Sequence, residues 1–306
     1  MLQSWRLTLL DSDLARIPAV AVRLAKLSGA RVWAFKVSDG AGLYSEFAQH
    51  TRLYTDTAAA LRDAGIEVAA WGFHYGRKWL SLVGPEREAK AVLQAREILA
   101  FRKYFVDAES RWEQSAREGD AAKLVKPLKD AGLEVWLESF RYPAYHPGIL
   151  WEEWGEVLNG GWAPQVYWLQ ASNAAAQVEQ SYREHKAVAD LPFWPVFPAF
   201  CQSGWCPTPA QYRAAIAEAE KLGAAGIGAW KAEWLTENWP AHKSFVDALA
   251  EWAGGDAPPE PQPCDPTDAI ALADNLKRQA DTLLAETQTL VSDAVTLLNK
   301  LQAMKR

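Results

Sequence analysis

Short apolar runs alternate with longer amphipathic stretches along most of the chain. The apolar runs cover residues 5–11, 31–40, 66–76, 104–110, 134–140, 164–171, 193–202 and 226–234. Between these runs, apolar residues recur at the spacing of one helix face. Continuous apolar strands that alternate with helices indicate a parallel sheet buried on both faces. Eight such units predict an α/β fold, a (β/α)8 or TIM barrel, in residues 1–254.

An open, doubly wound sheet is the alternative α/β architecture. Such a sheet usually carries a glycine-rich phosphate loop after its first strand. The corresponding segment here, LDSDLARIP, contains no glycine, which favours the barrel. Glycines instead follow several predicted helices, as in AGIEV and AGLEV, where they permit a left-handed turn into the next strand.

Two further segments follow the predicted barrel. Residues 255–266 are rich in proline and are predicted to form a linker. Residues 267–306 are predicted to form one long helix, because apolar residues from Ala269 to Met304 recur at alternating steps of four and three. The helix could pack on its own barrel or form a coiled coil with other copies. The linker favours the second arrangement, a homo-oligomer formed through residues 267–304.

Charge and composition exclude several classes of function. The 306 residues carry a net charge of −6 without a basic stripe, so nucleic-acid binding is not expected. No apolar run is long enough for membrane insertion, and the first residues lack the pattern of a signal peptide. The cysteines and histidines show no metal-ligand spacing, so no metal and no cofactor are expected. Cys201 and Cys206 could form a local disulfide, but two unpaired thiols are the favoured interpretation.

The fourth predicted strand ends in two carboxylates, Asp107 and Glu109. The chemistry of a TIM barrel lies at the strand ends, and alternate side chains of a strand share a face. Both carboxylates are therefore expected to point to the barrel mouth, where the less solvated one holds its proton longer. This arrangement suits glycoside hydrolysis. The alternative is a pair of ordinary carboxylates in salt bridges with Lys36 or Arg111.

Aromatic and polar residues gather at the other predicted strand ends. Aromatic rings pack against the apolar faces of sugar rings, so the 16 Trp residues suggest a sugar-binding groove, although Trp33 and Trp136 fit the core better. Asp11 ends the first predicted strand. The candidate ligand-binding residues are Lys36, Trp71, Phe73, His74, Tyr75, Glu138, Tyr167, Trp168, Gln170, Trp230 and Glu233.

Four of these strand-end motifs resemble, in order, those of glycoside hydrolase family 25, the muramidases. They are DSD, AFKVSDG, GFHYG and VDAE. The resemblance implies a TIM barrel that cuts peptidoglycan, with Glu109 as general acid and with Asp107 and Asp11 as supporting carboxylates. That family has a further acid near the end of strand six, where this chain has PQVYWLQA and Gln170.

The chain is also similar to glycoside hydrolase family 18, the chitinase-like barrels. Those barrels combine D-x-E at strand four with a Tyr at strand six and a Trp at strand eight, which Asp107, Glu109, Tyr167 and Trp230 match. Phe105 stands within the segment where that family has a longer acidic run. Both families cut polymers that contain N-acetylglucosamine. The resemblance implies that an Asp beside the acid orients the substrate's acetamido group, which then attacks the anomeric carbon.

These features predict a glycosidase whose partner is a polysaccharide of the peptidoglycan or chitin type. The alternative is a catalytically degenerate barrel that binds carbohydrate, or has a structural role, in a phage tail or cell-surface assembly. The lack of a signal peptide predicts synthesis in the cytoplasm, with release in a phage particle or through a holin-type route.

The heptad pattern of residues 267–304 predicts how the chain sediments. Burying each Leu of the seam is worth roughly 1.5–3 kcal/mol, so the helix should find a partner. We expect the full chain to sediment as a dimer or trimer and a chain ending at Gly255 to sediment as a monomer. If both are monomers at micromolar concentration, the coiled-coil prediction is wrong.

Overall fold

The computed structural model describes residues 1–77, 84–235, 245–246 and 248. The described residues do not include the predicted linker (255–266) or the predicted heptad helix (267–306). Both segments, the domain boundaries that they define and self-association therefore remain predictions. Within the described part of the chain, no helix combines the length and apolar character needed to cross a membrane.

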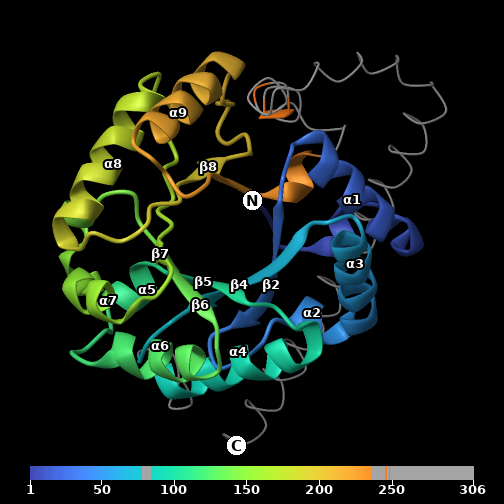
Figure 1. Ribbon diagram of the computed structural model, residues 1–306, viewed down its shortest axis with the longest axis horizontal. Coiled ribbons are helices and arrows are strands. Elements are labelled where there is room, and N and C mark those ends of the chain that lie inside the picture. Colours follow the sequence, from blue (N-terminus) through green and yellow to red (C-terminus); the bar gives the residue numbers. More distant parts are fainter. Residues whose placement is uncertain (78–83, 236–244, 247, 249–306) are drawn as a thin grey trace, which may run out of the picture. The chain divides into compact units, whose positions relative to one another are not determined.

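A curled, mostly parallel sheet forms the centre of the fold (Figure 1). Its strands are joined in the order β7-β6-β5-β4-β2-β1-β9-β8, and β3 pairs antiparallel with β2. Two isolated parallel bridges, Trp162–Phe193 and Gln165–Val196, connect the two ends of this order. The strands are β1 (Leu2–Ser4), β2 (Val32–Asp39), β3 (Gly42–Leu43), β4 (Glu67–His74), β5 (Lys103–Ala108), β6 (Glu134–Glu138), β7 (Gly161–Trp162), β8 (Val196–Pro198) and β9 (Gly228–Trp230).

Helices surround this sheet, as Figure 1 shows. The α-helices are α1 (Ile17–Leu27), α2 (Ser45–Gln49), α3 (Thr51–Asp63), α4 (Pro85–Leu99), α5 (Ser110–Glu113), α6 (Asp120–Asp130), α7 (Trp151–Val157), α8 (Ala174–Val188) and α9 (Pro209–Lys221). The short 3-10 helices are η1 (Leu7–Leu9), η2 (Leu14–Arg16), η3 (Pro143–Tyr145), η4 (Pro147–Ile149) and η5 (Ala232–Leu235). The arrangement is TIM-barrel-like, which confirms the predicted α/β fold class at this level.

Each strand places alternate side chains on opposite faces of the sheet. The outward-facing residues join a large apolar core with the helices. The inward-facing residues form a second, smaller cluster with a mostly aromatic centre. In it, Phe105 stacks on Trp136 with ring centroids 6.1 Å apart, and Trp194 packs edge-on against both rings. These rings fill the barrel interior below the strand ends.

Three local predictions are wrong. The sixth predicted strand, residues 164–171, is not a strand: β7 ends at Trp162, and Gln165 forms isolated bridges to Phe140 and Val196. The first strand is not residues 5–11: β1 ends at Ser4, and Leu7–Leu9 is a 3-10 helix closed by the bond from Leu10 N to Leu7 O. Its buried residues, Leu7 and Leu10, are three apart, which is helical rather than strand spacing. Cys201 and Cys206 are not free thiols but form a disulfide, because a Gln202–Trp205 bridge folds the loop back on itself.

A polar network on the outer face of the sheet depends on Gly72. The Tyr104 hydroxyl lies 2.7 Å from Ser38 Oγ and 2.9 Å from His74 Nε2, and His74 Nδ1 lies 3.0 Å from Glu88 of α4. All four residues are buried. A Cβ at Gly72 would overlap the Ser38 and Tyr104 oxygens and lie 2.9 Å from the Ser38 carbonyl.

We predict that Gly72→Ala lowers the free energy of unfolding by about 1–3 kcal/mol, because the added methyl group overpacks this site and separates a buried hydrogen-bonded pair. Urea unfolding measures the change. The control is Gly42→Ala, since an added Cβ at Gly42 has no atom within 4 Å. We expect the control to change the stability by less than about 1 kcal/mol. Equal effects of the two substitutions would contradict the prediction.

Candidate active site

Asp107 and Glu109 both follow the inward-facing Phe105 along β5 at intervals of two residues. Asp107 is buried, while Glu109 is half-buried and directly precedes α5. Burial raises the pKa of Asp107 well above its usual range, and the charges of Glu109 and Glu138 raise it further, whereas Lys36 opposes the shift. Glu109 therefore lies close enough to Asp107 for its charge to affect the protonation of Asp107.

Glu138 adds a third carboxyl group to this cluster. It is the register partner of Asp107 on the neighbouring strand β6, and its exposed fraction is 2%. Burial raises the pKa of Glu138 to about 8, with a contribution from the charge of Glu109, although hydrogen bonds from Gln3 and Gln165 act in the opposite direction. Glu138 is therefore mostly protonated at neutral pH.

Two amide side chains hold the carboxyl groups in place. Gln3 of β1 donates from Nε2 to Glu138 Oε2. Gln165, in the segment after β7, donates from Nε2 to Asp107 Oδ1 at 3.2 Å. Neither glutamine was predicted from the sequence, because an isolated glutamine beside an apolar run carries no distinguishing pattern.

An aromatic wall stands beside the carboxyl cluster. Trp230 of β9 stacks on Tyr167 at 6.2 Å and on Trp5 at 6.0 Å between ring centroids, and Phe200 packs edge-on against Tyr167 and Trp230. Burial raises the pKa of Tyr167, as do the charges of Glu138, Asp107 and Glu109. Tyr167 and Trp230 therefore lie next to the acids, as expected from the sequence, whereas Trp5 and Phe200 were not predicted.

A second polar group lies at the ends of β2 and β4. Lys36 Nζ lies 5.3 Å from the ring centroids of both Trp5 and Trp71, and 3.4 Å from Asp39 Oδ2. The Tyr75 hydroxyl donates to Asp39 Oδ1 at 2.9 Å. Phe73 packs edge-on against Tyr75, with ring centroids 5.0 Å apart. Lys36, Trp71, Phe73 and Tyr75 thus gather at the strand ends.

Two of the predicted ligand-binding residues lie on the outer face of the sheet instead. His74 is bonded between Tyr104 and Glu88, and Trp168 packs against Phe197 and Tyr212. Both are completely buried. His74 follows the inward-facing Phe73 on β4, so the alternation of side chains along that strand turns His74 outward. Trp168 is not in a strand but lies in the segment after β7, where its ring belongs to the outer apolar core.

Three further predicted residues lie apart from the cluster. The family 25 resemblance implied a catalytic role for Asp11. Its Oδ2 atom lies 3.5 Å from Arg16 Nε, and its Oδ1 atom accepts a hydrogen bond from the backbone N–H of Asp13. Gln170 is exposed, in a left-handed backbone conformation. Glu233 is buried and accepts hydrogen bonds from the backbone N–H groups of Trp5 and Arg6. The contacts of Glu233 join the segment after β9 to the end of β1.

A pocket of about 290 Å³ opens beside the carboxyl cluster. Gln165 and Tyr167 form part of its lining, so the pocket adjoins the amide that bonds Asp107. The rest of the lining comes from Phe140, Arg141, Tyr142, Tyr145, His146 and Leu169. Tyr145 is 70% exposed, and aromatic rings with polar tips of this kind suit contact with a sugar.

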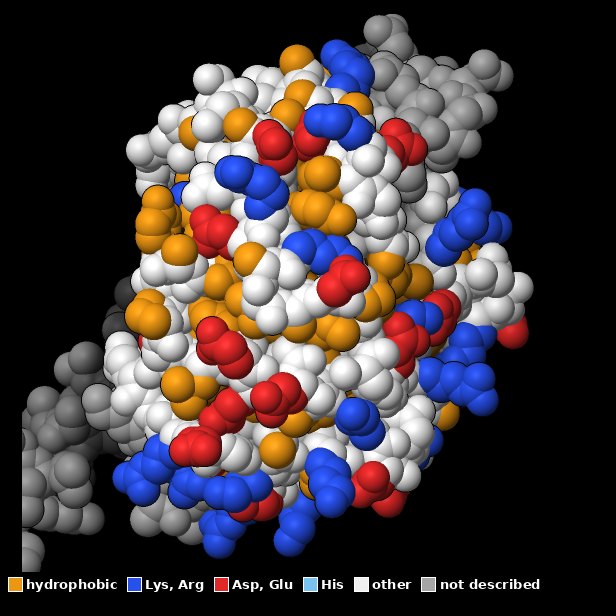
Figure 2. Space-filling view, turned by 60° about the vertical axis from the view of Figure 1, so that its left-hand side comes forward, with side chains coloured by type: hydrophobic (Ala, Val, Ile, Leu, Met, Phe, Trp, Pro, Cys, Tyr) orange, Lys and Arg blue, Asp and Glu red, His pale blue; other side chains and the backbone are white. Residues whose placement is uncertain are grey.

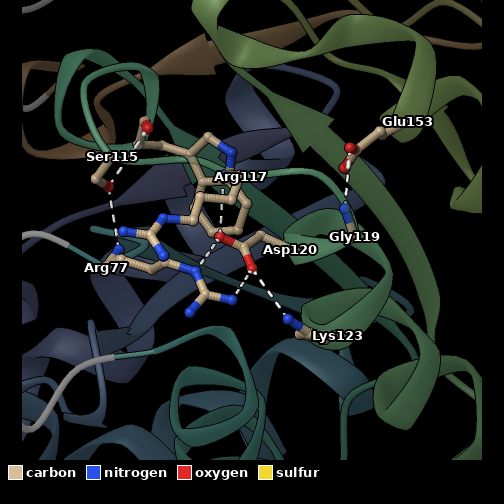
Figure 3. Close-up of polar contacts among 8 residues, drawn as sticks. Arg77, Ser115, Arg117, Gly119, Asp120, Lys123 and Glu153 are labelled. Carbon is tan, nitrogen blue, oxygen red and sulfur yellow. Dashed lines mark hydrogen bonds and ion pairs between the residues drawn. The ribbon is translucent and has the colours of Figure 1, made fainter.

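The segment that follows Glu109 is tied to the end of β4 by the polar network in Figure 3. Ser115 Oγ accepts from Arg77 N at 3.0 Å and donates to the Tyr75 carbonyl at 2.9 Å. Asp120, at the start of α6, receives two hydrogen bonds from the Arg77 guanidinium and lies 3.4 Å from Lys123 Nζ. These contacts fix the segment that follows the candidate acid against the end of β4.

The face in Figure 2 carries acidic and basic side chains interspersed with apolar ones. Among the residues that the structure describes, no three His, Cys, Asp or Glu side chains are grouped as a metal site requires.

Comparison with solved structures supports the fold. No protein-family model and no curated protein sequence matches the chain. The catalytic domain of a Pyrococcus furiosus chitinase aligns with a TM-score of 0.58 at 13% identity, covering 76% of this chain and 90% of that domain. A chitinase from Chromobacterium violaceum ATCC 12472 aligns with a TM-score of 0.59 at 12% identity, covering 84% and 99%.

A third neighbour is the spore cortex-lytic enzyme SleL from Bacillus megaterium QM B1551. It aligns with a TM-score of 0.54 at 8% identity, covering 81% of this chain and 73% of that chain. Identities this low establish a shared fold. The neighbours include several chitinases, so at the level of the fold they support the predicted family 18 resemblance, whereas the family 25 resemblance is not shown.

The Arg77–Asp120 pair yields a stability prediction. Burial alone would raise the pKa of Asp120, but hydrogen bonds from Arg77 and Arg117 N, with the charges of Arg77 and Lys123, lower it below its usual value. We expect Asp120→Asn to lower the free energy of unfolding by about 1–3 kcal/mol at pH 7. A lowered pKa stabilises the fold above the ordinary pKa, so the difference should shrink as the pH falls below about 4.

Urea unfolding at pH 7 and pH 3 tests this expectation. The control is Asp56→Asn, whose partner Arg52 lies 3.6 Å away on an exposed helix face. An exposed pair of this kind contributes less than about 0.5 kcal/mol. An Asp120→Asn effect as small as the control, or one that grows toward low pH, would contradict the assigned role of the pair.

Proposed function

We propose that this chain is a glycoside hydrolase that acts on a polysaccharide containing N-acetylglucosamine, with Glu109 as the general acid. The observation that carries the proposal is the Asp107–Glu109 pair at the inward-facing end of β5, beside a wall of Tyr167 and Trp230. Glu109 is half-buried and is therefore the more accessible member of the pair, since Asp107 is buried.

The roles of the two carboxyl groups follow from their surroundings. Glu109 donates a proton to the glycosidic oxygen as the bond to the leaving sugar breaks. Asp107 is held by Gln165 and does not need to move, so it can orient a polar substituent of the sugar at the reacting carbon. An acetamido group oriented in this way can attack that carbon itself, which removes the need for a separate nucleophile on the enzyme.

The aromatic residues supply the binding surface. A sugar ring has apolar C–H faces, and the stacked Trp5, Trp230 and Tyr167 rings offer flat surfaces beside the acids. Lys36 and the Asp39–Tyr75 pair supply polar groups at the barrel mouth, with Lys36 next to the Trp5 ring. Substrate classes that fit are chitin-type polymers and the glycan strands of peptidoglycan. The chitinase and spore cortex-lytic neighbours support these classes through the fold they share with the chain.

One observation favours a second candidate, a carbohydrate-binding barrel without catalysis. Phe105 lies two residues before Asp107 on β5 and packs against Trp136 and Trp194. The resemblance to family 18 leads one to expect an acidic residue at this position. Glu138 provides a carboxyl group at the level of Asp107, which favours the catalytic proposal over the binding one. Asp11, placed away from the acids, has no part in the proposed mechanism.

Hydrolysis by the wild type and by Glu109→Gln tests the proposal. Reducing-end release from chitin oligosaccharides and from purified cell walls is the measurement. The amide keeps the shape of the side chain but cannot donate the proton, so activity should fall by about 10²–10⁴-fold while the fold is retained. Glu118→Gln, an exposed site in the segment after α5, serves as the control and should keep full activity. Wild-type binding without hydrolysis of either polymer would favour the second candidate.

A further inference from the structure

Glu138 is the most deeply enclosed of the three carboxyl groups. Its exposed fraction is 2%, against 7% for Asp107, and Glu109 is half-buried. A side chain this enclosed is poorly placed to contact a sugar in the barrel mouth. The geometry therefore points to a role other than the ligand binding expected from the sequence, one exerted through the neighbouring acids.

Hydrogen bonds hold Glu138 beside Asp107. The two residues are paired in register on β6 and β5, and their side chains share the inward face. Gln165 donates to Asp107, and Gln3 donates to Glu138. Because the amide N–H groups can only donate, they anchor the carboxyl oxygens without supplying a positive charge.

The polar groups around Glu138 come from several parts of the chain. Asp107 and Glu109 face it from β5, and Tyr167 faces it from the segment after β7. Lys36 of β2 acts on Asp107, but its ammonium group also lies 3.4 Å from Asp39. From β1 comes only the neutral amide of Gln3. Three close carboxyl groups with so little compensating positive charge cannot all ionise together.

We propose that Glu138 is a positioning residue: its charge, once ionised, keeps the catalytic proton on the Asp107–Glu109 pair and so sets the alkaline limit of hydrolysis. This inference rests on the proposed function. Its physical basis is that a negative charge on Glu138 makes loss of a proton from the adjacent Asp107 less favourable. The raised pKa values of Asp107 and Glu138 agree with it.

The test is the pH dependence of kcat/KM for Glu138→Gln. The amide keeps the size of the side chain and removes the charge, so the alkaline limb of the profile should move to lower pH by about one unit or more. Glu138→Asp keeps the charge and should restore the limb toward its wild-type position. Glu134→Gln, at the opposite end of β6, is the matched control and should leave the limb unchanged. An unchanged limb in Glu138→Gln would overturn the inference.

A second measurement separates this inference from the proposed function. Infrared spectroscopy follows the C=O band of protonated carboxyl groups as the pH rises, whether or not the protein hydrolyses anything. We expect the band that remains in Glu138→Gln to disappear at lower pH than the corresponding wild-type band. If the wild type is inactive but shows this difference, the proposed function fails and the proton-holding role stands. If the remaining band titrates as in the wild type, the role of Glu138 is wrong.

Discussion

The site depends on the burial of several carboxyl groups side by side at the ends of β5 and β6. A buried charge without a partner costs several kcal/mol, so such groups either keep their protons or receive hydrogen bonds. The structure uses both means, since Asp107 and Glu138 have raised pKa values and two glutamines donate to them. Asp107 and Glu138 therefore hold their protons to higher pH than ordinary carboxyl groups, and they lie near the half-buried Glu109.

The barrel supplies the donors and the surroundings that this cluster requires. Gln3 comes from β1 and Gln165 from the segment after β7, so the cluster is completed only when distant parts of the chain come together. The Phe105, Trp136 and Trp194 rings pack below the acids and exclude water there. The exclusion of water strengthens the interaction between the carboxyl groups. The stacked Trp5, Trp230 and Tyr167 rings leave a flat surface beside them.

Much of the fold was predictable because it rests on periodicity. Eight apolar runs separated by amphipathic stretches indicated the barrel, and the two-residue repeat placed Asp107 and Glu109 on one face. His74 and Trp168 were assigned to the barrel mouth because consecutive residues at each predicted strand end were all assigned to the same face. The two-residue rule, applied to Phe73 of β4, would have placed His74 outside. Gln3 and Gln165 could not be predicted, since their roles depend on contacts between strands distant in sequence.

A crystal structure of the Glu109→Gln variant with a bound N-acetylglucosamine oligomer would test the central claim most directly. The account predicts a glycosidic oxygen within about 2.6–3.2 Å of the residue 109 side chain. It also predicts the acetamido group of the adjoining sugar next to Asp107, with a ring stacked on Trp230. An oligomer bound elsewhere on the protein, or one in the mouth with no glycosidic oxygen near residue 109, would contradict it.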